Sequence, residues 1–68
     1  MSDETYKLIE IAGTSSESLQ GAIENGVARA SKTLHNLSWF QVGEVRGRLD
    51  GGKVAEYQVI MKVGLKLD

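Results

Sequence analysis

The amino-acid sequence predicts an α+β fold in which one strand, one helix and two further strands follow in the order β-α-β-β. Three observations predict it. Apolar and polar residues alternate over 4–12 and again over 53–67, as in half-buried strands. Apolar residues between them recur every three or four positions, as on one face of a helix. A Gly51-Gly52 pair separates two extended stretches, which is typical of a tight hairpin.

The first strand is predicted over residues 4–12, where β-branched residues are enriched, and Gly13 is expected to end it. The serines that follow, together with Glu17, predict a helix start. A serine side chain accepts hydrogen bonds from the free N–H groups of a first helical turn. A carboxylate there is favoured by the helix dipole. This capping also accounts for the serines without a bound anion.

The helix is expected to run to about Asn36, with a single apolar stripe along it. Gly26 lies within this stripe, and we expect its missing side chain to let a strand or another helix approach closely. The stripe consists of Leu19, Ala22, Ile23, Gly26, Val27, Ala30 and Leu34.

The second strand is predicted over residues 37–49 and the third over 53–67, joined by a turn at 50–53. If residues 49 and 54 face each other, Trp39 and Gln58 share the sheet face that the helix leaves free. The same register places Gln58 opposite Val45. Trp39 and Gln58 are then roughly 20 Å apart along the strands, so they could touch one small ligand only between two chains.

Length and composition predict a partner chain. A chain of 68 residues buries only about 60% of its unfolded surface. Without cysteine, and with a single histidine, neither disulfides nor a structural zinc site can compensate. The third strand spans nearly 50 Å at about 3.3 Å per residue, whereas a helix of about 20 residues spans about 30 Å. The uncovered apolar face is therefore expected to meet a neighbouring chain.

Charge and targeting signals exclude several partners. Eight basic and nine acidic residues give a net charge of −1, so no nucleic acid or anionic membrane is expected as a partner. The first residues are acidic, and no apolar run approaches the roughly 18 residues of a membrane span. The protein is therefore expected to be cytoplasmic.

Catalytic residues are poorly represented. His35 has no evident serine–carboxylate partner, which favours a surface or helix-capping histidine. The stretch Gly51-Gly52-Lys53 lacks the spacing and the strand–loop–helix context of a phosphate loop. The sequence therefore predicts a protein that is not an enzyme.

Trp39 is the residue whose chemistry points to binding. An indole on a mixed, helix-free face is either an anchor for another subunit or a platform on which a flat ligand stacks. Its neighbours there are Gln41, Lys62 and glycines rather than a core. Both interpretations remain open on these grounds.

Four stretches of the sequence resemble the dodecin family of flavin-binding proteins. These are the stretch from Ile9 to Ser16, Trp39-Phe-Gln-Val42, Tyr57-Gln-Val59, and Met61-Lys-Val-Gly-Leu65. The resemblance extends over residues 1–68 as a single domain. It implies a long, bent, three-stranded antiparallel sheet partly wrapped around one helix. It also implies that twelve chains form a hollow sphere.

The resemblance also implies a site. Flavins would bind in pairs at two-fold contacts, with their rings sandwiched between Trp39 side chains of two chains. Gln58 would hydrogen-bond the polar edge of the ring. Arg46 would lie near the flavin phosphate or ribityl chain, and Gln41 near the pocket. Gln41 and Glu44 align near the pocket and metal positions of archaeal members. Those members have an acidic residue where this sequence has Gln41, so no metal is expected here.

These expectations combine into one hypothesis and two alternatives. The hypothesis is a store for FMN, riboflavin or lumichrome, in which stacking on tryptophan quenches flavin photochemistry. A structural oligomerisation module that binds another ligand, such as coenzyme A, is the first alternative; some bacterial dodecins hold coenzyme A. A small enzyme of the dimeric α+β type is the second, with His35 or Glu44 as its only candidate bases.

Overall fold

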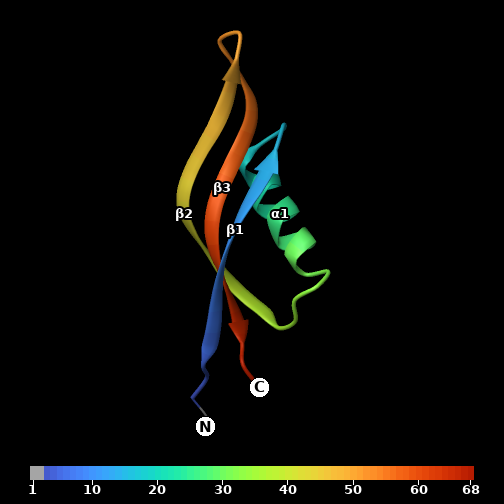
Figure 1. Cartoon of the computed structure of the whole chain (residues 1–68), viewed down its shortest axis with the longest axis vertical. Helices are drawn as coiled ribbons and strands as arrows, with labels where there is room; N and C mark the ends of the chain where they lie inside the picture. Colours follow the sequence, from blue (N-terminus) through green and yellow to red (C-terminus); the bar gives the residue numbers. More distant parts are fainter. Residues whose placement is uncertain (1–2) are drawn as a thin grey trace.

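The computed structural model describes residues 3–68 and confirms the predicted element order. The molecule is long and narrow (Figure 1), and its principal extents are 54 × 21 × 15 Å. The three strands form one antiparallel sheet in the order β1-β3-β2, with β3 in the centre. The elements are β1 (Tyr6–Ser15), α1 (Leu19–Ala30), β2 (Leu37–Asp50) and β3 (Lys53–Lys66).

Strand β1 does not end at Gly13, as the sequence had predicted, but continues to Ser15. Gly13 instead makes room for the helix: a Cβ atom there would collide with the carbonyl oxygen of Ala22. Gly26 on α1 lies against the same point, because a Cβ on it would come within 3.1 Å of the Gly13 Cα atom. The prediction that Gly26 allows close packing is therefore confirmed.

Helix α1 begins as predicted but is shorter. Ser18 is its N-cap, with a side-chain oxygen that accepts from the Gly21 N–H at 2.9 Å. The helix ends at Ala30 rather than near Asn36, which makes it about 18 Å long. The chain must turn here to begin β2, and Asn36, with a φ of 63°, accepts from the Lys66 N–H at 3.0 Å through its carbonyl. Pairing with β3 thus replaces the last helical turns.

The β2–β3 hairpin closes as predicted at Gly51 and Gly52, whose φ angles of 59° and 77° suit a tight turn. Its register departs from a regular ladder at Arg48/Leu49 and again at Val42/Glu44. The two irregularities cancel, so Trp39 lies opposite Gly64, as a regular hairpin would also place it. The segment between them is displaced by one residue.

This displacement corrects one prediction. Gln58 lies opposite Arg46 and not opposite Val45. Gly43 is the extra residue on β2, and such a bulge exchanges the faces onto which the following side chains point. Arg46 therefore shares a sheet face with Gln58 and Trp39, whereas the regular register had placed it on the other face.

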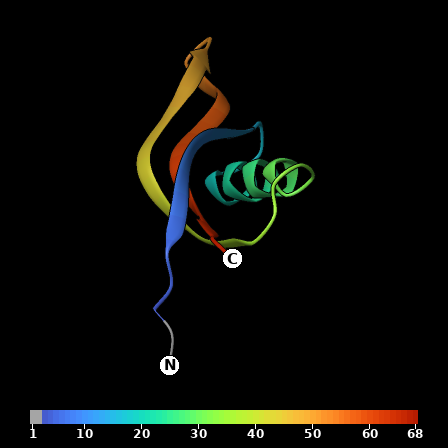
Figure 2. The ribbon, with the colours of Figure 1, turned by 60° about the horizontal axis from the view of Figure 1, so that its bottom comes forward.

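The core lies on the inner side of the curved sheet, which bends partly around α1 (Figure 2). Alternate residues of β3 fill it: Val59 and Met61 are 1% exposed and Val63 is 2% exposed. Val59 and Met61 pack with Ala22 of the helix, and the partly buried side chains around them are Ile11, Ile23 and Val27. The predicted sheet wrapped around one helix is confirmed.

Strand β2 carries a different surface. Its apolar side chains are largely exposed, with Phe40 at 48%, Val42 at 40% and Val45 at 52%. Leu19, predicted for the helix stripe, is also 41% exposed. The helix packs on β1 and β3, so the apolar inner side of β2 remains uncovered within the subunit. In residues 3–68, no helix is long and apolar enough to cross a membrane.

Candidate functional site

Trp39 lies near the start of β2, on the sheet face away from the helix. It is opposite Gly64 in the ladder and 38% exposed. The indole occupies the space directly over Gly64, because a Cβ atom on that glycine would come within 2.7 Å of the indole Nε1 atom. The indole therefore packs directly on the backbone of Gly64, and any larger residue at position 64 would displace the ring.

Tyr6 of β1 contacts this tryptophan from the side. The two ring centroids are 5.8 Å apart and the planes meet at 65°, an edge-to-face arrangement. Tyr6 reaches the same face because it pairs with Lys66, two residues beyond Gly64 on β3. Trp39 is thus held from below and from one side, and part of its surface remains open to solvent.

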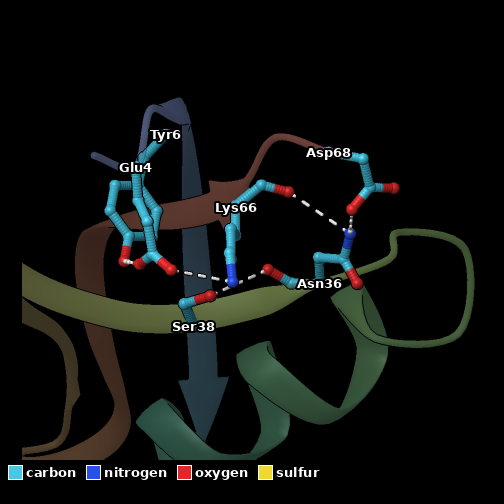
Figure 3. A network of polar contacts seen from close by, with 6 residues as sticks. All are labelled: Glu4, Tyr6, Asn36, Ser38, Lys66 and Asp68. Atoms are coloured by element: carbon cyan, nitrogen blue, oxygen red, sulfur yellow. Dashed lines mark hydrogen bonds and ion pairs between the residues drawn. The ribbon is translucent and has the colours of Figure 1, made fainter. Parts of the chain in front are cut away.

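A carboxylate lies beyond the phenol. Tyr6 donates a hydrogen bond from its hydroxyl to the Glu4 Oε1 atom at 3.0 Å, and Glu4 Oε2 lies 2.8 Å from Lys66 Nζ (Figure 3). The bond from Lys66, with a smaller effect from Tyr6, lowers the pKa of the Glu4 carboxyl below its usual value. The bond to Glu4 in turn raises the pKa of the Tyr6 phenol.

A second cluster of polar side chains lies on the same sheet face, nearer to the turn between β2 and β3. Arg46 donates from Nε to the Gln58 Oε1 atom at 3.1 Å, and Gln58 donates from Nε2 to Glu56 at 3.3 Å. Glu44 lies 3.8 Å from the Arg46 guanidinium in a largely exposed ion pair, an interaction that contributes little to stability. The bulge at Gly43 is what turns both charged side chains to this face.

Trp39 and the polar cluster of Arg46 and Gln58 are too far apart for one small ligand within one subunit. Trp39 is opposite Gly64 and Arg46 opposite Gln58, so six residues of β3, about 20 Å, separate them. Gln41 lies between them, opposite Lys62. The pocket of about 140 Å³ that borders Trp39 is lined by Val27 of the helix and by Phe40 and Val63, so it opens on the inner side of the sheet and not over the exposed part of the indole. A flat ligand on Trp39 would need a second chain to enclose it.

The structure also places the other candidate residues. His35 is exposed in the loop between α1 and β2, and Glu44 faces Arg46. Within residues 3–68, no three histidine, cysteine or acidic residues gather as metal ligands would. Sequence reasoning did not identify Tyr6 or the role of Gly64. The strand register, which pairs residues 6 and 8 with 66 and 64, is the signal that would have found them.

Comparison with known proteins decides the family. A family model described as Dodecin matches residues 5–68. The chain belongs to the dodecin family. The dodecin of Thermus thermophilus is 49% identical to it over 63 residues, which are 93% of this chain and 91% of that protein. The resemblance drawn from the sequence motifs is confirmed.

Solved dodecin structures have the same fold. That of the Streptomyces davaonensis dodecin superposes with a TM-score of 0.93 at 57% identity, covering 98% of each chain. A calcium dodecin from Mycobacterium tuberculosis, described as calcium-chelating, superposes with a TM-score of 0.80 at 31% identity, covering 94% of this chain and 91% of that one. The dodecin fold thus includes a protein described as binding calcium.

Proposed function

We propose that this dodecin is a flavin-binding storage protein, assembled as a hollow homododecamer in the cytoplasm. The observation that carries the proposal is the partly exposed indole of Trp39, which is fixed over Gly64 on the sheet face away from the helix. Family membership supports the assembly. The exposed apolar side chains of β2 supply surface for subunit contacts.

In this proposal the rings of paired flavins stack between the Trp39 side chains of two subunits. An electron-rich indole and a planar, electron-poor isoalloxazine bury a large area with little loss of side-chain entropy. FMN, riboflavin and lumichrome share this ring system, so all three are candidate ligands. Electron transfer from Trp39 to the excited ring would quench its photochemistry without any turnover, which fits a store rather than an enzyme.

Polar residues on the same face would then orient the ligand. The carboxamide of Gln58 offers both donors and acceptors, which match the carbonyl and N–H groups on the ring's polar edge. Arg46 already hydrogen-bonds Gln58 and can turn its remaining N–H groups to a ribityl or phosphate oxygen. Gln41 lies between the two ends of the face and is the third polar candidate.

A riboflavin titration tests this function. Flavin emission is expected to be strongly quenched by the unmodified oligomer and unquenched by Trp39→Ala. His35→Ala is the matched control, because His35 is exposed and only four residues away in the chain. It should quench as the unmodified protein does. Equal quenching by the unmodified protein and Trp39→Ala would contradict the proposal.

The apolar surface of β2 favours a second candidate, a structural oligomerisation module that binds another ligand. In that case Trp39 would anchor a neighbouring subunit, and Trp39→Ala would dissociate the oligomer instead of removing flavin. Coenzyme A is the ligand to test, because a groove between β1 and the end of α1 contains Arg29 and Lys32 beside Ile11 and Leu34. Two cations beside apolar side chains suit a phosphorylated cofactor. Calorimetry with coenzyme A, repeated with Arg29→Ala, tests this ligand, and the mass of the Trp39→Ala oligomer distinguishes the two functions.

A further inference from the structure

Tyr6 has no part in the proposed stacking, yet the structure holds it in van der Waals range of the stacking residue. Its ring meets Trp39 edge to face, with centroids 5.8 Å apart. The contact leaves part of the indole exposed. Two aromatic rings this close are well coupled for the transfer of a single electron, so the phenol of Tyr6 can exchange an electron with Trp39 directly.

The phenol also has a base in contact with it. A phenol that loses an electron becomes a strong acid. The phenol therefore gives up an electron easily only where its proton can leave at the same time. Tyr6 donates to Glu4 Oε1 at 3.0 Å, and Glu4 is paired with Lys66 at 2.8 Å (Figure 3). Beside the Lys66 ammonium, which lowers its pKa, Glu4 is a carboxylate at neutral pH, and its Oε1 atom already accepts the hydrogen bond along which the phenolic proton can move.

We propose that Tyr6 is a second electron donor behind Trp39, with Glu4 as its proton acceptor. This inference rests on the proposed function, in which Trp39 gives one electron to a light-excited flavin. Trp39 then regains one electron from Tyr6, while the phenolic proton passes to Glu4 and converts its carboxylate to a carboxylic acid. One electron from the flavin ring and the proton on Glu4 finally return to Tyr6. No group is consumed.

Such a relay would give the store a protective function. The positive charge left on Trp39 after it gives an electron to the excited flavin would be neutralised. The radical would then lie on Tyr6, one ring further from the ligand. Tyr57 provides the comparison within the same chain. It lies on the opposite face of β3, opposite Ser15 and Gly47, and so cannot reach the indole of its own subunit.

The test begins with flavin-free protein. One-electron oxidation of the oligomer by azide radicals, in pulse radiolysis, oxidises tryptophan and allows any transfer to tyrosine to be followed by absorbance. We expect the indole radical to decay as a phenoxyl radical grows in, with a rate independent of protein concentration. Tyr6→Phe is expected to abolish the phenoxyl signal, and Tyr57→Phe to leave it unchanged. Glu4→Gln, which keeps the phenol but removes the base, should slow the transfer.

The second arm uses the riboflavin-loaded oligomer and a blue-light pulse. A phenoxyl signal is expected in the unmodified protein and should be lost in Tyr6→Phe, whereas steady-state quenching remains because Trp39 is intact. Phenoxyl formation that survives Tyr6→Phe, or that is lost in Tyr57→Phe, would overturn the relay alone. If riboflavin fails to bind the unmodified protein, the proposed function is overturned, and with it the role of Tyr6 towards flavin.

Discussion

Strands β2 and β3 are partners in one hairpin and have the same length of 14 residues, but their environments differ. On β3, Val59 and Met61 are 1% exposed. On β2, their cross-strand neighbours Val45 and Val42 are 52% and 40% exposed. The paired positions carry apolar side chains on both strands, so side-chain type does not explain the difference.

Position in the sheet explains it. β3 lies between β1 and β2 and is covered by α1, whereas β2 is an edge strand beyond the reach of a 12-residue helix. An edge strand of this length that exposes apolar side chains invites pairing with another chain. β3 therefore builds the fold of the subunit. In the proposed function, β2, which carries Trp39, Gln41 and Arg46, supplies the surface through which subunits and ligand would meet.

The largest effect is expected from truncation in the covered strand. Met61→Ala should lower the free energy of unfolding by about 2–5 kcal/mol, because it opens a cavity in the core. Val42→Ala, on the facing residue of β2, should lower it far less and act on oligomer dissociation. Urea unfolding followed by circular dichroism, with size-exclusion chromatography at each urea concentration, measures both. Equal losses in unfolding free energy would remove the distinction between the strands.

A smaller effect is expected where the two strands meet under Trp39. Gly64→Ala would place a methyl group against the indole and should cost about 1–3 kcal/mol of unfolding free energy. It should also shift the tryptophan emission and weaken riboflavin binding. Gly43→Ala is the control, because a Cβ there meets nothing closer than 3.6 Å. Unchanged emission in Gly64→Ala would show that the indole does not pack directly on Gly64.

The polar end of the site should distinguish flavins. Arg46→Ala is expected to weaken FMN binding about tenfold, or ~1.4 kcal/mol, because a charge-assisted bond to phosphate is lost. Riboflavin, which has no phosphate, should lose less. Parallel fluorescence titrations of both ligands measure the difference. An equal loss for both would place Arg46 at the ring or ribityl chain instead.

The smallest effect concerns the exposed pair beside Tyr6. The pKa of Glu4 is lowered in the folded state, chiefly by Lys66. Its contribution to stability is therefore present above the carboxyl's unfolded-state pKa and is lost as pH falls through the folded-state pKa. NMR titration should show the Glu4 pKa returning towards its ordinary value in Lys66→Ala. Lys62→Ala, four pairs away in the ladder, should leave it where it is.

The element order and the hairpin turn could be predicted because periodicity and the Gly51-Gly52 pair are local signals. The face of Trp39 was also predicted, although the register reaches it through two irregularities that cancel. A bulge depends on how a whole strand pairs, so the one-residue displacement that brings Arg46 opposite Gln58 has no signal in the local pattern.

The end of the helix was missed for a related reason. Asn36 leaves the helical path to pair its carbonyl with Lys66, thirty residues away, and no local propensity encodes such a partner. The contact of Tyr6 with Trp39 likewise joins the two outer strands of the sheet across β3. The residues missing from the predicted site are thus those that long-range pairing brings to it.

Size separation combined with absorbance spectroscopy tests whether Trp39 holds a flavin between the subunits of an oligomer. Purified protein is incubated with riboflavin and separated by size, and the absorbance spectrum of each fraction is recorded together with its mass. We expect flavin absorbance in the oligomer fraction of the unmodified protein, and a Trp39→Ala oligomer of the same mass without flavin. Flavin absorbance that persists in the Trp39→Ala oligomer, or that elutes with single subunits, would contradict it.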